Sequence, residues 1–182
     1  MTNSNKIKKM TILTFMLAMI VVLQVVATYI NFGFPITLTL VPIVVLGATY
    51  GVGMGALGGL VFGAVVDIMV VTGADPGGAA LFAIHPVVIM LMCIIKGVMA
   101  GVCSALIYKL FRNKNSKIDI ILAAVVAPIV NTGIFYLCLI IFFDYDFSIL
   151  FGAFISVNFL IELLTNVILA PGLDILVEKY KE

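Results

Sequence analysis

Residues 11–30 read Thr-Ile-Leu-Thr-Phe-Met-Leu-Ala-Met-Ile-Val-Val-Leu-Gln-Val-Val-Ala-Thr-Tyr-Ile and hold no charged side chain. A helix needs about 20 apolar residues to cross the hydrocarbon core of a bilayer. The whole chain shares this character, since 64% of its 182 residues are hydrophobic and 10% are charged. Ordinary soluble domains have about 25% charged residues, so the composition excludes a soluble globular domain and a disordered chain. The net charge of +1 gives no basic face for nucleic acid.

Six apolar segments predict an all-α integral membrane protein, a six-transmembrane-helix bundle that forms one domain over residues 1–182. Helices are expected because the bilayer interior requires every backbone amide to be paired internally. The second segment is short and contains Pro42. The predicted spans are approximately residues 8–30, 36–50, 52–73, 86–111, 117–143 and 149–177.

The basic residues predict the orientation of these spans. They precede the first span, separate the fourth from the fifth and follow the sixth, whereas the other connections hold only acidic charges such as Asp75 and Asp144. The positive-inside rule then places both termini in the cytoplasm. A five-span count would put Lys179 and Lys181 outside. The basic flanking residues are Lys6, Lys8, Lys9, Lys109, Arg112, Lys114, Lys117, Lys179 and Lys181.

Two sequence features leave alternatives open. The external connection 74–85 contains Asp75-Pro-Gly-Gly78, which is typical of a turn, and it is either a plain connection or a lid. Glycines recur every four residues from Gly47 to Gly63, and Gly97 and Gly101 repeat this spacing. Such a face serves either internal helix packing or a sliding surface for another membrane subunit.

Ionisable residues at membrane depth are costly and therefore indicate function. Lys96 lies about 15 Å from the outer end of the fourth span at 1.5 Å per residue. It forms either a structural ion pair with Glu162 or part of a water-accessible cavity for a polar solute. Polar stripes on the first, fifth and sixth spans favour a pocket open to the outside. The candidate substrate-binding residues are Lys96, Asn131, Asn158, Glu162, Asp67 and Tyr136.

Catalytic and metal-binding patterns are absent from the sequence. No phosphate loop and no nucleophile–base pair occurs, so neither ATP hydrolysis nor another enzyme activity is expected. Cys93, Cys103 and Cys138 lie in apolar runs without a Cys-x-x-Cys spacing, which favours small core residues over a metal site. No cofactor is predicted.

Two local segments resemble a known family. They are Ile36-Thr-Leu-Thr-Leu-Val-Pro-Ile-Val-Val-Leu-Gly47, followed by Gly51-Val-Gly-Met-Gly-Ala-Leu-Gly-Gly-Leu-Val-Phe-Gly63, and Lys96-Gly-Val-Met-Ala-Gly101. With six short spans and a basic connection after the fourth, the chain resembles the substrate-binding S components of energy-coupling factor (ECF) vitamin transporters. Such proteins usually carry Ala-x-x-x-Ala on the first helix, where this chain has Thr14, Ala18 and Val22.

The resemblance implies a mechanism and a set of partners. An S component captures a vitamin from outside, docks on a shared transmembrane subunit driven by two ATPase subunits, and topples in the bacterial cell membrane to release its cargo. Thr14, Ala18 and Val22 would then form the partner interface. Lys96 suits a carboxylate, and pantothenate is the first substrate expected, with folate, riboflavin, niacin and a queuosine precursor left open.

A second resemblance points to another class of protein. Gly58-Gly-Leu-Val-Phe-Gly-Ala-Val-Val-Asp67 resembles a segment of the MreD family, whose members are small structural scaffolds of the cell-wall elongation machinery. On this alternative the chain binds proteins instead of a vitamin. Lys96 and Glu162 at mid-depth argue against it.

Overall fold

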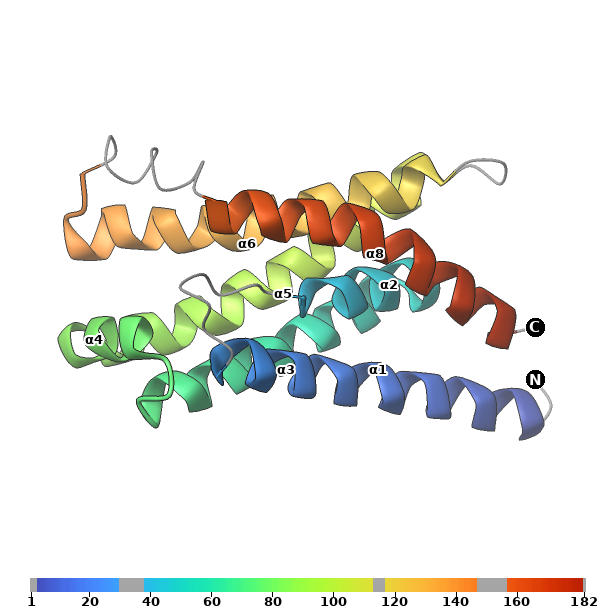
Figure 1. Cartoon of the computed structure of the whole chain (residues 1–182), viewed down its shortest axis with the longest axis horizontal. Helices are drawn as coiled ribbons and strands as arrows, with labels where there is room; N and C mark the ends of the chain where they lie inside the picture. Colours follow the sequence, from blue (N-terminus) through green and yellow to red (C-terminus); the bar gives the residue numbers. More distant parts are fainter. Residues whose placement is uncertain (1–2, 30–37, 113–116, 147–156, 182) are drawn as a thin grey trace.

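The computed structural model describes residues 3–29, 38–112, 117–146 and 157–181, and every element within these ranges is a helix (Figure 1). The helices lie roughly along one direction and form a bundle. They are α1 (Asn3–Tyr29), α2 (Leu40–Tyr50), α3 (Val52–Val71), α4 (Pro76–Ile84), α5 (Pro86–Phe111), α6 (Ile118–Phe143) and α8 (Val157–Lys181). The predicted all-helical class is therefore confirmed.

Four helices are long and apolar enough to cross a membrane: α1, α3, α5 and α6. Their bounds agree with the first, third, fourth and fifth predicted spans within a few residues. α2 has 11 residues and is about 16 Å long, which is well short of a bilayer's hydrocarbon core. α8 covers most of the sixth predicted span, whose first residues, 149–156, lie outside the described ranges. The count of six spans stays a prediction.

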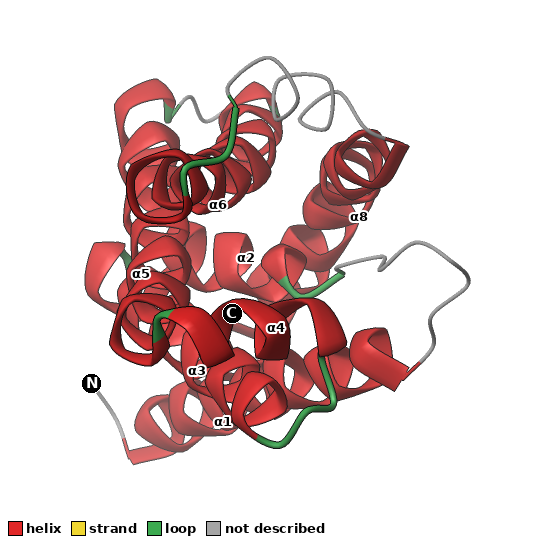
Figure 2. Cartoon of the chain, turned by 90° about the vertical axis from the view of Figure 1, so that its left-hand side faces the viewer, coloured by secondary structure: helices red, strands yellow, loops and turns green. Residues whose placement is uncertain are grey.

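α2 is short because it forms the middle of the bundle. All residues from Leu40 to Gly47 are buried, and the helix packs against α1, α3, α5, α6 and α8. Figure 2, which looks along the bundle from the end that carries α4, shows α2 surrounded by the longer helices. At its start, the Thr39 hydroxyl donates a hydrogen bond to Oε1 of Gln24 on α1, 3.0 Å away. α2 is thus a core element that fixes the spacing of its neighbours.

Glycines make the contact between α3 and α5, the most extensive helix pair in the fold. A Cβ added at Gly59 would collide with the backbone carbonyl of Gly97, and a Cβ at Gly101 would collide with that of Gly55. Small residues let two helix backbones approach this closely inside a membrane. The glycine spacing therefore serves internal packing, and this face is not free for another subunit.

The connection between α3 and α5 is a helix where the sequence predicts a turn. Asp75 caps α4, since its Oδ1 accepts a hydrogen bond from the Gly78 amide at 3.1 Å, and Pro76 occupies the first helical turn. Both are favoured positions for these residue types. The alanines and leucine that follow are strong helix formers and outweigh the two glycines. No residue of α4 is fully buried, so the helix lies on the bundle and not within it.

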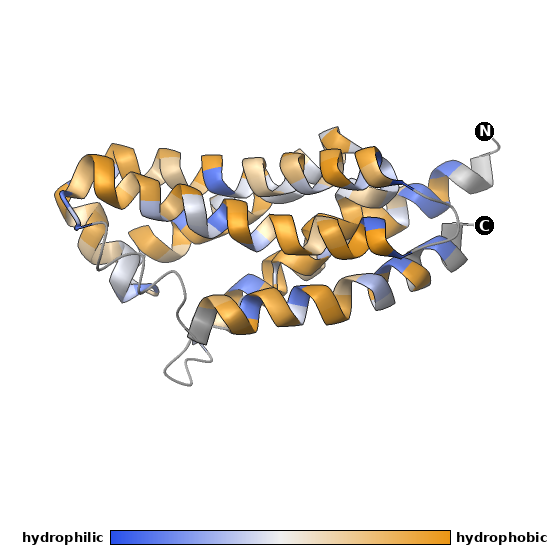
Figure 3. Cartoon of the chain, turned by 90° about the horizontal axis from the view of Figure 1, so that it is seen from above, coloured by the Kyte–Doolittle hydropathy of each residue, from blue (hydrophilic) through white to orange (hydrophobic). Residues whose placement is uncertain are grey.

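Both termini lie at the same end of the molecule, and α4 lies at the opposite end (Figure 1). The helix surfaces are mainly apolar, and hydrophilic residues gather toward the end with the termini (Figure 3). At that end Lys117 bridges α6 and α8, with Nζ 3.5 Å from Asp174 and 3.3 Å from Glu178. The arrangement agrees with the predicted grouping of basic residues on one side.

Candidate binding site

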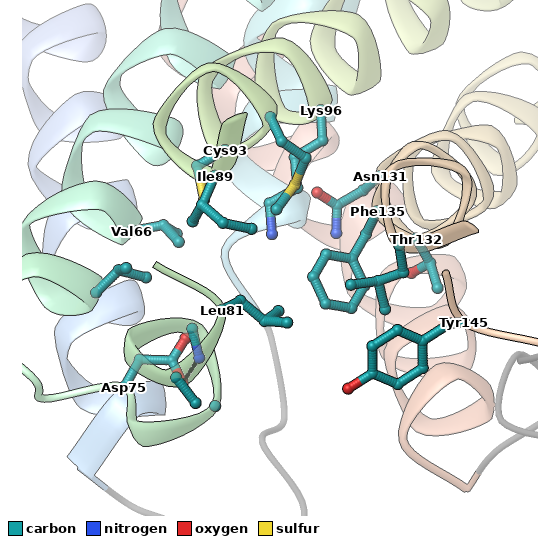
Figure 4. Close-up of a pocket in the computed structure, with 16 residues that line it drawn as sticks. Val66, Asp75, Leu81, Ile89, Cys93, Lys96, Asn131, Thr132, Phe135 and Tyr145 are labelled. Atoms are coloured by element: carbon teal, nitrogen blue, oxygen red, sulfur yellow. Dashed lines mark hydrogen bonds between the residues drawn. The ribbon is translucent and has the colours of Figure 1, made fainter. Parts of the chain in front are cut away.

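A cavity of about 540 Å³ lies between α3, α4, α5 and α6, near the end opposite the termini. Sites for small molecules usually measure about 300–1,000 Å³ and are mostly apolar with a few polar groups. This cavity matches that description (Figure 4). Its lining consists of Val66, Val70, Asp75, Gly77, Gly78, Ala80, Leu81, Ile89, Met92, Cys93, Lys96, Asn131, Thr132, Phe135, Leu139 and Tyr145.

A second cavity of about 250 Å³ adjoins the first on the side of α1. Gln24 and Thr28 of α1 line it, together with part of α3 and the start of α4. Asp75, Lys96 and Asn131 line both cavities, so their side chains stand between the two spaces. The polar stripe predicted on the first span therefore faces the same region as Lys96.

Lys96 occupies the centre of this region without a carboxylate partner. Its Nζ lies 5.3 Å from the ring centroid of Phe135 on α6 and 5.9 Å from that of Phe62 on α3. Aromatic faces at such distances attract a cation. Within the described ranges no carboxylate lies at ion-pair distance from Lys96, so of the two alternatives for this residue the structure does not show the ion pair with Glu162. The charged end of Lys96 therefore lies in the cavity lining without a neutralising carboxylate among the described residues.

Asp67 and Glu162 are buried near Lys96 but do not line either cavity. Their residues are 9% and 7% exposed, and both interact electrostatically with Lys96. Asp67 Oδ1 and Glu162 Oε1 have no hydrogen-bond partner in the part of the chain that the structure describes. The two carboxylates therefore lie near Lys96, but neither belongs to the described lining of the cavities.

Asn131 is the second predicted residue in the cavity wall. It is 8% exposed, and its Oδ1 has no hydrogen-bond partner among the described residues. A buried polar atom without a partner is costly, and a ligand donor would satisfy it. Tyr136 is half-buried on the same helix and lies close enough to Glu162 to interact with it electrostatically. Asn158 belongs to α8, but its side chain lies outside the described part of the chain.

The sequence reasoning did not select several residues of the cavity wall. Asp75 precedes Pro76, and an acidic residue in this position is a favoured helix cap. The four residues that begin with Asp75 are also typical of a turn, which is what the sequence predicts. Phe135 lies one turn from Asn131 on the same helix and stacks beside Lys96. Tyr145 follows α6 and had no sequence signal that would bring it to the cavity.

The predicted partner residues lie on the outer face of α1. Thr14, Ala18 and Val22 are all exposed, and Val22 is 57% exposed. Met16 and Ile20 on the opposite face are buried in the core. The spacing of four residues keeps the three positions on one helix face, and that face is accessible from outside the bundle.

A family model described as "ECF transporter, substrate-specific component" matches residues 8–175, which is nearly the whole chain. No curated protein and no solved structure gives a significant match.

Proposed function

The chain belongs to the family of ECF transporter substrate-specific components, and from this we propose that it captures a vitamin or related micronutrient at the outer face of a bacterial cell membrane. Proteins of this family bind and transport small molecules and are not enzymes. The family match does not support the alternative of a cell-wall scaffold. On this proposal, the end that carries α4 faces outward and both termini lie in the cytoplasm, in keeping with the positive-inside rule.

The surroundings of Lys96 support a binding site at this residue. Its ammonium group lies between the two cavities and beside two aromatic rings. It has no carboxylate partner among the described residues. An unneutralised cation in a largely apolar cavity favours an anionic ligand. Asn131 lies in the same wall and offers an acceptor to a ligand donor. Asp67, Glu162, Tyr136 and Asn158 are proposed to shape the field and the wall around this contact.

Pantothenate is the first ligand that we propose. Its single carboxylate suits Lys96, and its amide suits Asn131. Its methyl groups suit the apolar wall that Ile89, Met92 and Leu139 provide. The shared transmembrane subunit and two ATPase subunits would then drive release into the cell, with Thr14, Ala18 and Val22 as the docking face on α1.

Native mass spectrometry of the detergent-purified protein tests this function. We expect a stoichiometric small molecule with the mass of a vitamin, carried from the growth medium. The Lys96→Met variant should lose it, because methionine keeps an unbranched side chain of nearly the same length and removes the charge. Lys109→Met, at an exposed position near the end of α5, is the matched control and should retain it. An empty protein that no vitamin stabilises against heat would contradict the proposal.

A further inference from the structure

The charged residues of the cavity wall form two poles. Within the described lining of both cavities, Lys96 is the basic residue and Asp75 is the acidic one. Lys96 comes from the middle of α5, and Asp75 comes from the start of α4. Figure 4 shows them on opposite sides of the cavity, with Leu81 between them. We propose that the ligand is a bipolar molecule, with a carboxylate at Lys96 and a hydroxyl or amine donor at Asp75.

This inference rests on the proposed function, because it concerns the ligand of the same cavity. Only one of the two oxygens of the Asp75 carboxylate accepts a hydrogen bond from the described residues. Oδ1 accepts the Gly78 amide and caps α4, whereas Oδ2 has no hydrogen-bond partner among the described residues. A ligand donor can therefore bind Oδ2 while the helix cap stays intact.

The middle of the cavity determines what joins the two poles. Val70, Ile89 and Phe135 contribute apolar surface to the cavity lining, and Asn131, which lines both cavities with Lys96, adds one unsatisfied acceptor. A ligand with an apolar body and a single amide would leave few polar groups unpaired. A dicarboxylate would gain attraction at Lys96 and meet repulsion at Asp75. Asp75 thus acts as the repulsive element that specificity requires.

Four acids that share an eight-carbon chain and differ in the group at its far end test this assignment: ω-aminooctanoate, ω-hydroxyoctanoate, octanoate and octanedioate. Isothermal titration with the full-length protein should rank the amino and hydroxy acids above octanoate, and octanoate above octanedioate. In Asp75→Asn the preference for the amino acid over the diacid should fall by about tenfold. Asparagine caps helices as well as aspartate does, so α4 should stay folded.

Asp144→Asn is the matched control. Asp144 is exposed, follows α6 and does not belong to the described cavity lining. It has φ 53°, a left-handed conformation that asparagine tolerates well. This variant should keep the wild-type ranking. If Asp75→Asn prefers ω-aminooctanoate over octanedioate as strongly as the wild type does, the assignment is overturned, and equal affinity of the wild type for all four acids would also overturn it.

Failure of this inference is distinguishable from failure of the proposed function. If the wild type carries a vitamin that depends on Lys96, but Asp75→Asn keeps the full wild-type preference for ω-aminooctanoate over octanedioate, the function holds and the second pole is wrong. If the wild type binds neither a vitamin nor any of the acids, the proposed function itself fails.

Discussion

At the scale of a residue, Glu162 is a buried acidic side chain near Lys96 that lies outside the described cavity lining. Its carboxylate is buried on α8, and it acts on Lys96 from a distance without forming an ion pair. Asn166 does not satisfy it, because the Asn166 amide donates to the Glu162 backbone carbonyl at 2.8 Å. Two like charges would therefore compete for Lys96 once an anionic ligand enters. If Glu162 is ionised, we expect it to limit the affinity of the proposed site for anions.

Replacing Glu162 with glutamine should tighten the binding of an anionic ligand by about tenfold if Glu162 is ionised, since charges in a buried, poorly screened site interact strongly. Isothermal titration with the vitamin found on the wild type measures the change. Glu178→Gln is the control, because Glu178 is exposed and pairs with Lys117 at the far end of α8. Unchanged affinity in Glu162→Gln would show that Glu162 carries no charge beside Lys96.

Helix packing at the scale of elements depends on Gly59. A methyl group at this position meets the backbone of α5 and cannot be accommodated by moving one flexible side chain. Gly59→Ala should separate α3 from α5 and lower the melting temperature in detergent by roughly 4–10 °C, as expected for overpacking of about 1–3 kcal/mol. Binding should weaken as well, because Val66 and Lys96 of these two helices line both cavities.

Gly133→Ala provides the contrast for this experiment. Gly133 lies within α6, and an added Cβ there meets no atom within 4 Å in the described structure. Alanine is favoured over glycine by about 1 kcal/mol inside a helix, so this variant should keep or raise the melting temperature. Equal destabilisation by both substitutions would contradict the close approach of α3 and α5.

The Lys117 bridge between α6 and α8, at the end of the bundle that carries the termini, predicts a dependence on pH. Partial burial lowers the pKa of Lys117, but hydrogen bonds and charges from Glu178 and Asp174 outweigh this and raise it above its ordinary value of 10.5. A raised pKa means that the stabilisation is complete below the unfolded-state value and is lost as the pH rises through the folded-state value.

Lys117→Met should therefore lower the melting temperature by roughly 1–3 °C near neutral pH, the size expected for a partly exposed ion pair. The difference from the wild type should shrink above about pH 10.5, where the lysine loses its proton. Thermal unfolding across this pH range measures it, with the exposed Lys109→Met as control. A difference that stays constant at high pH would refute the role of the lysine charge.

The sequence predicts the long helices well because one physical signal determines them. Long apolar runs mark α1, α3 and α6, and Pro86 marks the start of α5 at the predicted residue. The helix α4 was missed because Gly77 and Gly78 favour a turn locally. It forms because Leu81 and Phe82 pack against the core, and such a contact between distant segments leaves no local pattern.

The candidate site follows the same division. Lys96 and Asn131 stand out in the sequence because polar groups are costly at membrane depth, and both line the cavity. Asp75 and Tyr145 lie at the ends of helices, where polar residues are ordinary. Only the fold shows that their segments come together over Lys96. The sequence alone shows which polar residues lie deep in a predicted span, but it does not show which separate segments come together in the fold.

At the scale of the whole molecule, the cavity and the proposed docking face lie in different places. The cavity is near the end that carries α4, and the exposed face with Thr14, Ala18 and Val22 lies along the outside of α1. Gln24 and Thr28 reach the smaller cavity from another part of the same helix. α1 therefore links the ligand region to the proposed docking face, and the two functions should be separable by mutation.

Ala18→Trp should block docking while leaving capture intact. Ala18 is exposed, so the large ring should be tolerated by the isolated protein, but it would keep a partner helix from approaching the face. Native mass spectrometry should still find the vitamin, whereas co-purification with the shared transmembrane subunit and cellular uptake should fall at least tenfold. Ile141→Trp, 66% exposed on α6, is the control and should preserve uptake. Normal uptake by Ala18→Trp would move the docking face away from α1.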